Sequence, residues 1–211
     1  MVKQRGYSPK KRNSGRRKIG RVLLVSAEGN TNNKTEKLYL NHFNGENIKV
    51  RFVSGNETDP EKMMQRLVTA YNYFELDSQD LAVCLIDSDF EVDRDKTIKK
   101  VDDMVRAAQK ENLCLIVSSP SFELWYICHF RYSTRQYQNN QDVLNELRRF
   151  IPNYEKSKDV YSCLQGKEDE AVKNAQKLEK WCSDNGKCFH CVECMPSTEM
   201  YKVLQWIREV H

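Results

Sequence analysis

The sequence predicts an α/β protein with a parallel sheet of about four strands, flanked by helices and followed by a C-terminal helical extension. Short apolar runs alternate with longer amphipathic segments between residues 21 and 131. The apolar runs are continuous and do not alternate with polar residues, which is typical of strands covered on both faces. Two of the runs are followed by carboxylates, and this places acidic groups at the carboxyl edge of the expected sheet.

Apolar runs predict the strands, and apolar stripes near the 3.6-residue period predict the helices. The expected strands are residues 22–27, 48–53, 81–86 and 113–117. Helices are expected between them at residues 35–43, from residue 59 onward, and at residues 95–110. Asp59 and Pro60 supply an N-cap and a first-turn proline for the second of these helices. After the fourth strand the pattern is helical, at residues 122–130, 142–150, 168–182 and 197–210.

The chain divides into a basic tail at residues 1–20, a core at residues 21–131 and a mainly helical extension at residues 132–211. We expect the extension to pack on the core, with a separately folding subdomain as the alternative. With 39% apolar and 30% charged residues, the composition is that of a soluble globular protein. Neither a membrane span nor a secretory signal is predicted, so we expect a cytoplasmic protein without a membrane partner.

Basic charge is concentrated in the tail. Residues 1–21 contain nine Lys or Arg and no Asp or Glu, so the net charge of +4 hides a remainder with 25 basic and 30 acidic residues. A segment this polar cannot bury a core and is expected to be disordered alone. Its expected role is to bind nucleic-acid phosphates, with a purely solubilising tail as the alternative. The candidate residues are Lys10, Lys11, Arg12, Arg16, Arg17 and Lys18.

Acidic side chains follow two of the expected strands. Glu28 comes after the first strand, and Asp87 and Asp89 come after the third. Residues i and i+2 of an extended chain point the same way, so Asp87 and Asp89 can face one point while Ser88 faces away. Converging carboxylates repel each other unless a cation neutralises them. The pattern therefore indicates an Mg²⁺ or Mn²⁺ site, with helix capping and turn formation as the alternative.

Several short blocks resemble the RloB-like family, in the order of that family, from about residue 22 to the end of the chain. The most specific block is Ser119-Pro120-Ser121-Phe122-Glu123-Leu124-Trp125, followed by His129. The other blocks are Ala27-Glu28-Gly29, Lys34-Thr35-Glu36 with Tyr39, Ile86-Asp87-Ser88-Asp89, Tyr154 with Lys156, residues 171–175, and Pro196-Ser197-Thr198. The sequence departs from the family pattern in the longer spacer at residues 30–34 and in Met195, where the family tends to have asparagine.

The RloB-like family is similar to Toprim nucleases, so the resemblance implies a Toprim-like fold and a divalent-metal phosphodiesterase. It also implies phage defence through abortive infection, together with a partner ATPase of the RloA-like AAA/ABC type. By the same analogy we favour RNA, with tRNA as one candidate, over DNA as the substrate. Carried over to this sequence, the catalytic and metal-binding residues are Glu28, Glu36, Asp87, Asp89 and Glu123.

Three polar residues after the fourth strand have two interpretations each. Glu123 interrupts an apolar stretch, where an unpaired buried carboxylate would be costly, and this favours a role in the site. His129 is either catalytic or a hydrogen-bonded structural histidine. Lys156 either neutralises transition-state charge on a phosphate or lies on the surface.

Cysteines are numerous in the last quarter of the chain. Cys188, Cys191 and Cys194 are spaced C-x₂-C-x₂-C, and Cys182 or His190 could complete a tetrahedral Zn²⁺ site. The alternative is a loop with free thiols, because a single short loop would have to supply nearly all the ligands. Without an export signal, persistent disulfides are not expected.

The preferred function is a metal-dependent nuclease that acts on nucleic-acid phosphodiesters with a partner ATPase. The alternative from a different class is a non-catalytic nucleic-acid-binding or regulatory subunit of an ATPase complex. A third candidate, nucleotidyl transfer as in primases, would use the same metal site. The sequence leaves homo-oligomerisation open.

Overall fold

The computed structural model describes residues 20–28, 35–55, 58–90, 93–187 and 190–210. One sheet of five strands, in the order β2-β1-β3-β4-β5, forms its centre. The strands are β1 (Arg21–Ser26), β2 (Ile48–Phe52), β3 (Leu81–Asp87), β4 (Leu113–Ser119) and β5 (Ser197–Thr198). The first four are parallel, and β5 runs antiparallel to β4. The carboxyl ends of β1, β3 and β4 therefore lie next to one another at one edge.

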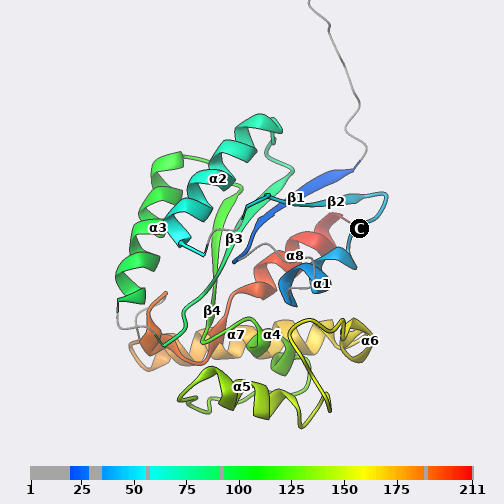
Figure 1. Cartoon of the computed structure of the whole chain (residues 1–211), viewed down its shortest axis with the longest axis vertical. Helices are drawn as coiled ribbons and strands as arrows, with labels where there is room; N and C mark the ends of the chain where they lie inside the picture. The colour runs from blue at the N-terminus through cyan, green and yellow to red at the C-terminus, as the bar shows by residue number, and fades with distance from the viewer. Residues whose placement is uncertain (1–19, 29–34, 56–57, 91–92, 188–189, 211) are drawn as a thin grey trace, which may run out of the picture.

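Helices cover both faces of the sheet (Figure 1). On one face lie α2 (Pro60–Tyr73) and α3 (Arg94–Ala108), which bury Met64 and Ile98 against Leu24 of β1. The Asp59 carboxylate caps α2 by accepting from the backbone N–H of Lys62 at 2.9 Å, and Pro60 is the first helical residue, as predicted.

The opposite face carries the larger part of the core. Its helices are α1 (Thr35–Asn41), α4 (Glu123–Cys128), α7 (Glu168–Asp184) and α8 (Met200–Val210). Fully buried Trp125 and Tyr39 pack there with apolar residues of β1 and β3. Outside this layer lie α5 (Asn140–Leu147), which packs on α4, and the short helix α6 (Tyr161–Leu164) (Figure 1). A 3₁₀ helix, η1 (Val192–Cys194), precedes β5.

The predicted fold class is confirmed, with a mostly parallel sheet between two layers of helices. The four expected strands end within two residues of their predicted bounds. The fifth strand was missed, because residues 197–198 were assigned to the last helix, which begins at Met200. A strand of two residues has no periodicity of its own, and it forms here because the outer edge of β4 offers partners at Ser118 and Ser119.

The extension packs on the core through strand pairing and apolar contacts. β5 adds to the sheet, and residues of α7 and α8 share one core cluster with residues of β1, β3 and β4. In the described part of the chain, no helix is both long and apolar enough to cross a bilayer.

Candidate active site

The carboxyl edge of the sheet presents the acidic residues that follow β3. Asp87 is the last residue of the strand, and Ser88 extends the ladder by donating its N–H to Ser118 O at 2.9 Å. Asp89 N donates to Pro120 O at 3.0 Å. The backbone at Asp89 has a φ of 47°, in the left-handed region that aspartate enters more readily than most residues. The chain therefore turns at Asp89 and is no longer extended there.

Ser88 faces away from the acidic residues, as the alternation of an extended chain predicts. Its hydroxyl is fully buried and donates to the Ser119 hydroxyl at 2.8 Å. This contact fixes the backbone between Asp87 and Asp89 against the neighbouring strand β4.

Glu123 is buried at the start of α4, with partners for both of its carboxylate oxygens. The Ser121 hydroxyl donates to Oε2 at 2.8 Å, and the Tyr154 hydroxyl donates to Oε1 at 3.1 Å. Lys156 Nζ lies 3.5 Å from Oε1. Because Tyr154 and Lys156 belong to the extension, this part of the chain helps to build the acidic edge of the sheet.

Thr35, the first residue of α1, joins the first crossover to the same network. Its Oγ1 lies 3.2 Å from the Tyr154 hydroxyl and donates to Lys156 O at 3.2 Å. Glu36 follows directly in the first turn of α1, and its negative charge acts on Asp87 and on Lys156.

Asp87 lies at the electrostatic centre of these groups. Burial raises the pKa of Asp87 well above its ordinary value, and the charges of four neighbouring carboxylates raise it further. In order of decreasing effect, these carboxylates are Glu36, Glu123, Glu28 and Asp89. Side chains from four separate segments therefore act on one another here, and their mutual repulsion favours any cation that can enter.

Two cationic side chains compensate part of this negative charge. Burial opposes the charge of Lys156, but Glu123, Asp87 and Glu36 raise the pKa of Lys156, which keeps its ammonium charged at neutral pH. Arg94, the first residue of α3, is buried and was not predicted from the sequence.

Arg94 contacts three parts of the acidic edge. Its Nε and Nη2 donate to Asp87 O at 2.8 and 2.6 Å, and its Nη2 also donates to the Glu28 carboxylate. The same Nη2 lies 3.8 Å from Asp89 Oδ2. A cation in the first turn of a helix is disfavoured by the helix dipole. An arginine at this position of the sequence therefore indicates that its side chain pairs with a group outside the helix.

The donor set fits a divalent cation of the Mg²⁺ type, which prefers carboxylate oxygens. Such a charge would relieve most directly the repulsion that Asp87 receives from the four other carboxylates. In the described residues, no three Asp, Glu, His or Cys side chains are placed to share one ion, and Arg94 pairs with Glu28 and Asp89 instead.

A family model described as RloB-like protein matches residues 23–207 of the chain. The chain belongs to the RloB-like family. Neither the curated proteins nor the solved structures gave a match. The matched range includes the acidic edge and nearly all of the extension, so the network that joins Tyr154 and Lys156 to Glu123 lies within the family region.

The structure of this RloB-like chain brings together six of the seven predicted catalytic residues. They are Glu28, Glu36, Asp87, Asp89, Glu123 and Lys156. The seventh, His129, lies in the aromatic core against the rings of Trp125 and Tyr39.

His129 has the surroundings of a structural histidine. Its Nδ1 lies 2.9 Å from Trp125 O, and Nε2 has no hydrogen-bond partner among the described residues. Burial lowers the pKa of His129 to about 4, so the ring is neutral at physiological pH. With only 1% of its surface exposed, it is out of reach of a substrate, and the structure supports the structural interpretation over the catalytic one.

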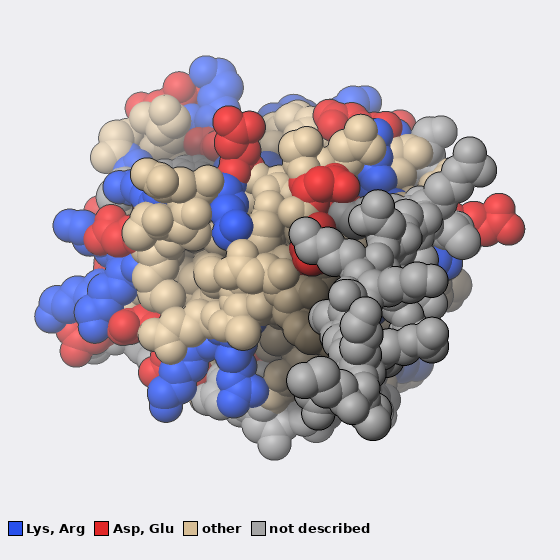
Figure 2. Space-filling model, turned by 90° about the horizontal axis from the view of Figure 1, so that it is seen from above, with Lys and Arg blue, Asp and Glu red and all other residues tan. Residues whose placement is uncertain are grey.

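The basic tail, including all six of its candidate residues from Lys10 to Lys18, lies outside the described residues. Figure 2 shows the face seen from the top of Figure 1, where described Lys and Arg side chains lie mainly around the edge and are mixed with Asp and Glu. The described residues of this face therefore form no continuous basic patch.

The predicted zinc site is not supported where the structure describes it. Cys182 and Cys194 form a disulfide, with Cα atoms 5.5 Å apart, and a disulfide sulfur cannot serve as a thiolate ligand. Cys191 is a free thiol, and Cys188 lies outside the described residues. Our expectation that the chain has no disulfide was wrong, because the end of α7 returns next to η1.

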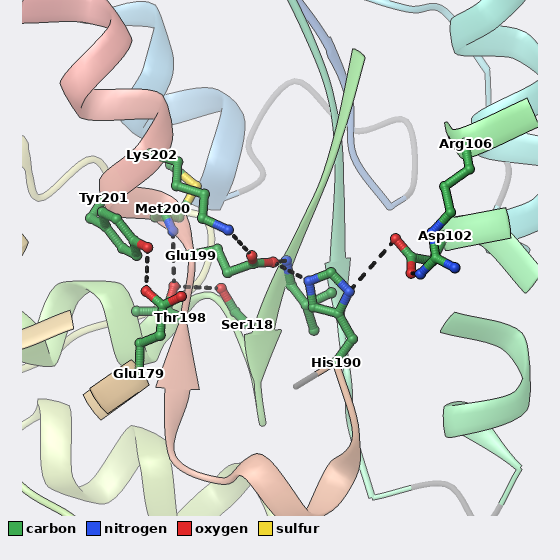
Figure 3. Close-up of polar contacts among 11 residues, drawn as sticks. Asp102, Arg106, Ser118, Glu179, His190, Thr198, Glu199, Met200, Tyr201 and Lys202 are labelled. Carbon is green, nitrogen blue, oxygen red and sulfur yellow. Dashed lines mark hydrogen bonds and ion pairs between the residues drawn. The ribbon is translucent and has the colours of Figure 1, made fainter. Parts of the chain in front are cut away.

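A second buried polar network lies between α3, β4 and α8 (Figure 3). Buried Glu199 accepts from Val117 N at 3.0 Å, pairs with His190 Nε2 at 2.7 Å and is in contact with Lys202. His190 Nδ1 lies 3.9 Å from Asp102 Oδ1 of α3. His190, a candidate zinc ligand, here joins the loop before β5 to two neighbouring elements.

Proposed function

We propose that this RloB-like protein is a divalent-metal-dependent nuclease of the Toprim type, which hydrolyses phosphodiester bonds of nucleic acids and prefers RNA to DNA. The observation that carries the proposal is the gathering of four carboxylates around Asp87 at the carboxyl edge of the sheet. Ligands of parallel sheets bind at this edge. The preference for RNA, the role in antiphage abortive infection and the RloA-like partner ATPase rest on the family analogy.

Glu28, Asp87 and Asp89 are the residues that would hold Mg²⁺ or Mn²⁺, with Glu36 and Glu123 close to them. When bound there, the cation polarises a phosphoryl oxygen and lowers the pKa of a coordinated water. Glu123 keeps its position because hydroxyls of Ser121 and Tyr154 donate to it. A charged Lys156 beside Glu123 can also donate N–H to a phosphate oxygen of the substrate.

One observation favours the non-catalytic alternative, a nucleic-acid-binding or regulatory subunit. The Arg94 guanidinium pairs with Glu28 and lies near Asp89, and it thereby supplies positive charge to two of the metal-binding residues from within the chain. A site whose carboxylates are fully satisfied by Arg94 would bind no metal and would have a structural role only.

Replacement of Asp87 by alanine separates these two functions. Protein is incubated with mixed single-stranded RNA and DNA in Mg²⁺ or Mn²⁺, alone and with the partner ATPase. We expect the wild-type protein to cleave nucleic acid and Asp87→Ala to cleave at least about 100-fold more slowly, as when several kcal/mol of transition-state stabilisation are removed. Calorimetry with Mn²⁺ should show binding to the wild-type protein that the variant loses.

The matched control is Asp93→Ala, which removes an exposed carboxylate that pairs with Lys96 on the surface. It should leave both cleavage and Mn²⁺ binding unchanged. If the wild-type protein cuts neither nucleic acid under any of these conditions, or if Asp87→Ala cuts equally well, the nuclease proposal is wrong.

A further inference from the structure

Three arginines surround one buried carboxylate beside the acidic edge. Glu146 of α5 is 1% exposed, and Nη1 atoms of Arg131, Arg135 and Arg149 lie 3.1, 3.0 and 3.1 Å from its oxygens. The arginine side chains are 42%, 45% and 65% exposed, respectively. We refer to these four residues as the arginine cluster.

The cluster contains more positive charge than Glu146 requires. One guanidinium in contact would neutralise the buried carboxylate, whereas three leave a surplus of two positive charges. The additional arginines repel one another, and exposed ion pairs contribute little stability. Stability alone therefore does not account for three arginines at one carboxylate.

The donors of the cluster suit a phosphate group. Each guanidinium has five N–H donors in a planar fork that matches phosphate oxygens, and it stays charged at any physiological pH. Arg131 uses one nitrogen for Glu146 and another for the Ser133 hydroxyl at 3.1 Å. Arg135 also lies over the Tyr137 ring, 5.7 Å from its centroid, which limits the freedom of its side chain. The partly exposed guanidiniums are thus held near one another with donors left for a ligand.

Contacts at both ends of α5 place the cluster next to the acidic edge. Asn140, the first residue of α5, donates to Asp89 Oδ1 at 3.3 Å. Just after α5, Arg148 Nε donates to Tyr154 O at 3.2 Å, and the Tyr154 hydroxyl contacts Glu123. Glu146 lies six residues after Asn140, which corresponds to about 9 Å along the helix axis.

From this placement we propose that the arginine cluster binds backbone phosphates of a nucleic acid strand whose bond to be cleaved lies at the neighbouring acidic edge. The inference deepens the proposed function, because it names the surface that holds the substrate strand. It assigns strand binding to described residues at the end of the core and in the extension, in addition to any contribution of the basic tail. The contacts are to phosphates and carry no base preference.

A binding measurement without metal tests this inference separately from cleavage. The double variant Arg131→Gln/Arg149→Gln keeps the Arg135–Glu146 pair, so that Glu146 is not left as an unpaired buried carboxylate. Fluorescence anisotropy of labelled mixed-sequence single-stranded RNA, and of DNA of the same sequence, is recorded in EDTA over a range of salt concentrations. The charge-matched control is Lys62→Gln/Lys99→Gln, two exposed lysines of α2 and α3 on the opposite face of the sheet.

We expect the arginine variant to bind at least tenfold more weakly than the control at moderate salt. Its log–log salt slope should be smaller by about 1.4, since each lost phosphate contact on a single strand removes about 0.7. Equal binding by both double variants, or no binding by the wild-type protein, would overturn the inference. Circular dichroism verifies that both double variants are folded. If the double arginine variant is unfolded, the single variant Arg149→Gln replaces it.

The outcomes also separate this inference from the nuclease proposal. If nucleic-acid binding depends on the arginine cluster but the protein cleaves no nucleic acid, the inference is supported and the nuclease proposal is contradicted. An arginine variant that binds nucleic acid normally and cleaves it at the normal rate contradicts the inference and supports the nuclease proposal.

Discussion

At the scale of single residues, Asp87 lowers the stability of the metal-free fold and is also a proposed metal-binding residue. Burial and four neighbouring carboxylates raise the pKa of Asp87 in the folded protein. The stability that such a group contributes is fully present below its unfolded pKa and is lost as the pH rises through the folded pKa. At neutral pH, Asp87 therefore leaves the metal-free protein less stable than it is at low pH.

Asp87→Asn should consequently raise the melting temperature at pH 7 in EDTA while it abolishes nuclease activity. For a chain of this size each kcal/mol corresponds to about 2–4 °C, so we expect a rise of at least about 2 °C. The gain should disappear near pH 3, where the carboxyl group is protonated in both states. Differential scanning fluorimetry measures both values, and Asp93→Asn at the exposed surface should give no rise. A lower melting temperature for Asp87→Asn at pH 7 would contradict this account.

Arg94 is the second residue on which the acidic edge depends. It is a buried arginine at the start of α3, and its partners come from the ends of β1 and β3. The cost of a cation at a helix N-terminus is offset by these contacts to carboxylates and to a backbone carbonyl. The residue therefore fixes the first turn of α3 against the end of the sheet.

At the scale of elements, Glu199 attaches the loop before β5 and the start of α8 to the sheet (Figure 3). Burial would raise the pKa of Glu199, but the hydrogen bond and charge of His190, together with Lys202, lower it below its ordinary value. A lowered pKa means stability that is present above the unfolded pKa and is lost as the pH falls through the folded pKa.

Glu199→Gln should therefore destabilise the protein at pH 7 by about 2 kcal/mol, the range for hydrogen bonds to a charged group. The difference from the wild-type protein should shrink as the pH falls through the lowered pKa of folded Glu199, where its carboxylate becomes protonated. Urea unfolding at pH 7 and at low pH gives both values. Glu193→Gln, an exposed neighbour in the same loop region, is the control and should have little effect. A deficit of equal size at both pH values would contradict the electrostatic explanation.

The disulfide between Cys182 and Cys194 joins the end of α7 to η1 and lies in the same region. It closes a loop with a sequence separation of 12 residues. In the chain-entropy model a loop of this length corresponds to about 3 kcal/mol of stability.

Reduction of the protein, or Cys194→Ser, should lower the free energy of unfolding by about 2–3 kcal/mol. Chemical denaturation with and without a reductant measures the change, and mass spectrometry of unreduced peptides identifies the bond. Cys163→Ser, which removes an exposed free thiol, should change nothing. Full reactivity of Cys182 and Cys194 with a thiol reagent in the oxidised, unfolded protein would disprove the bond.

At the scale of the whole molecule, core and extension share one apolar cluster. α7 and α8 contribute Ala175, Leu178 and Val203 to the core cluster that also contains Leu23 of β1 and Trp125 of α4. Without them, one face of the sheet would expose its apolar residues to water.

A fragment that ends at residue 131 should therefore fail to fold. We expect poor dispersion in its amide NMR spectrum and binding of a hydrophobic dye, whereas the full chain shows a dispersed spectrum. The comparison fragment ends at residue 199, so that it retains β5 and α7 and lacks only α8. A cooperative unfolding transition for the 131-residue fragment would show that the core folds alone.

The sequence by itself determined the order of strands and helices, because continuous apolar runs and helical stripes are local patterns. It also located Glu28, Asp87 and Asp89, since carboxylates after parallel strands meet at one edge whatever the detailed packing. These features depend on neighbours in the chain and on the topology of parallel sheets.

Only the tertiary structure decided which distant residues complete the acidic edge and which residues leave it. Arg94 contacts Glu28, and Tyr154 contacts Glu123, across long separations in sequence, and no periodicity encodes such contacts. His129 carries the side chain of a catalytic residue, but packing against Trp125 places it in the core. The pairing of β5 and the Cys182–Cys194 bond arise in the same way, since partners of this kind are selected by proximity after the elements have packed.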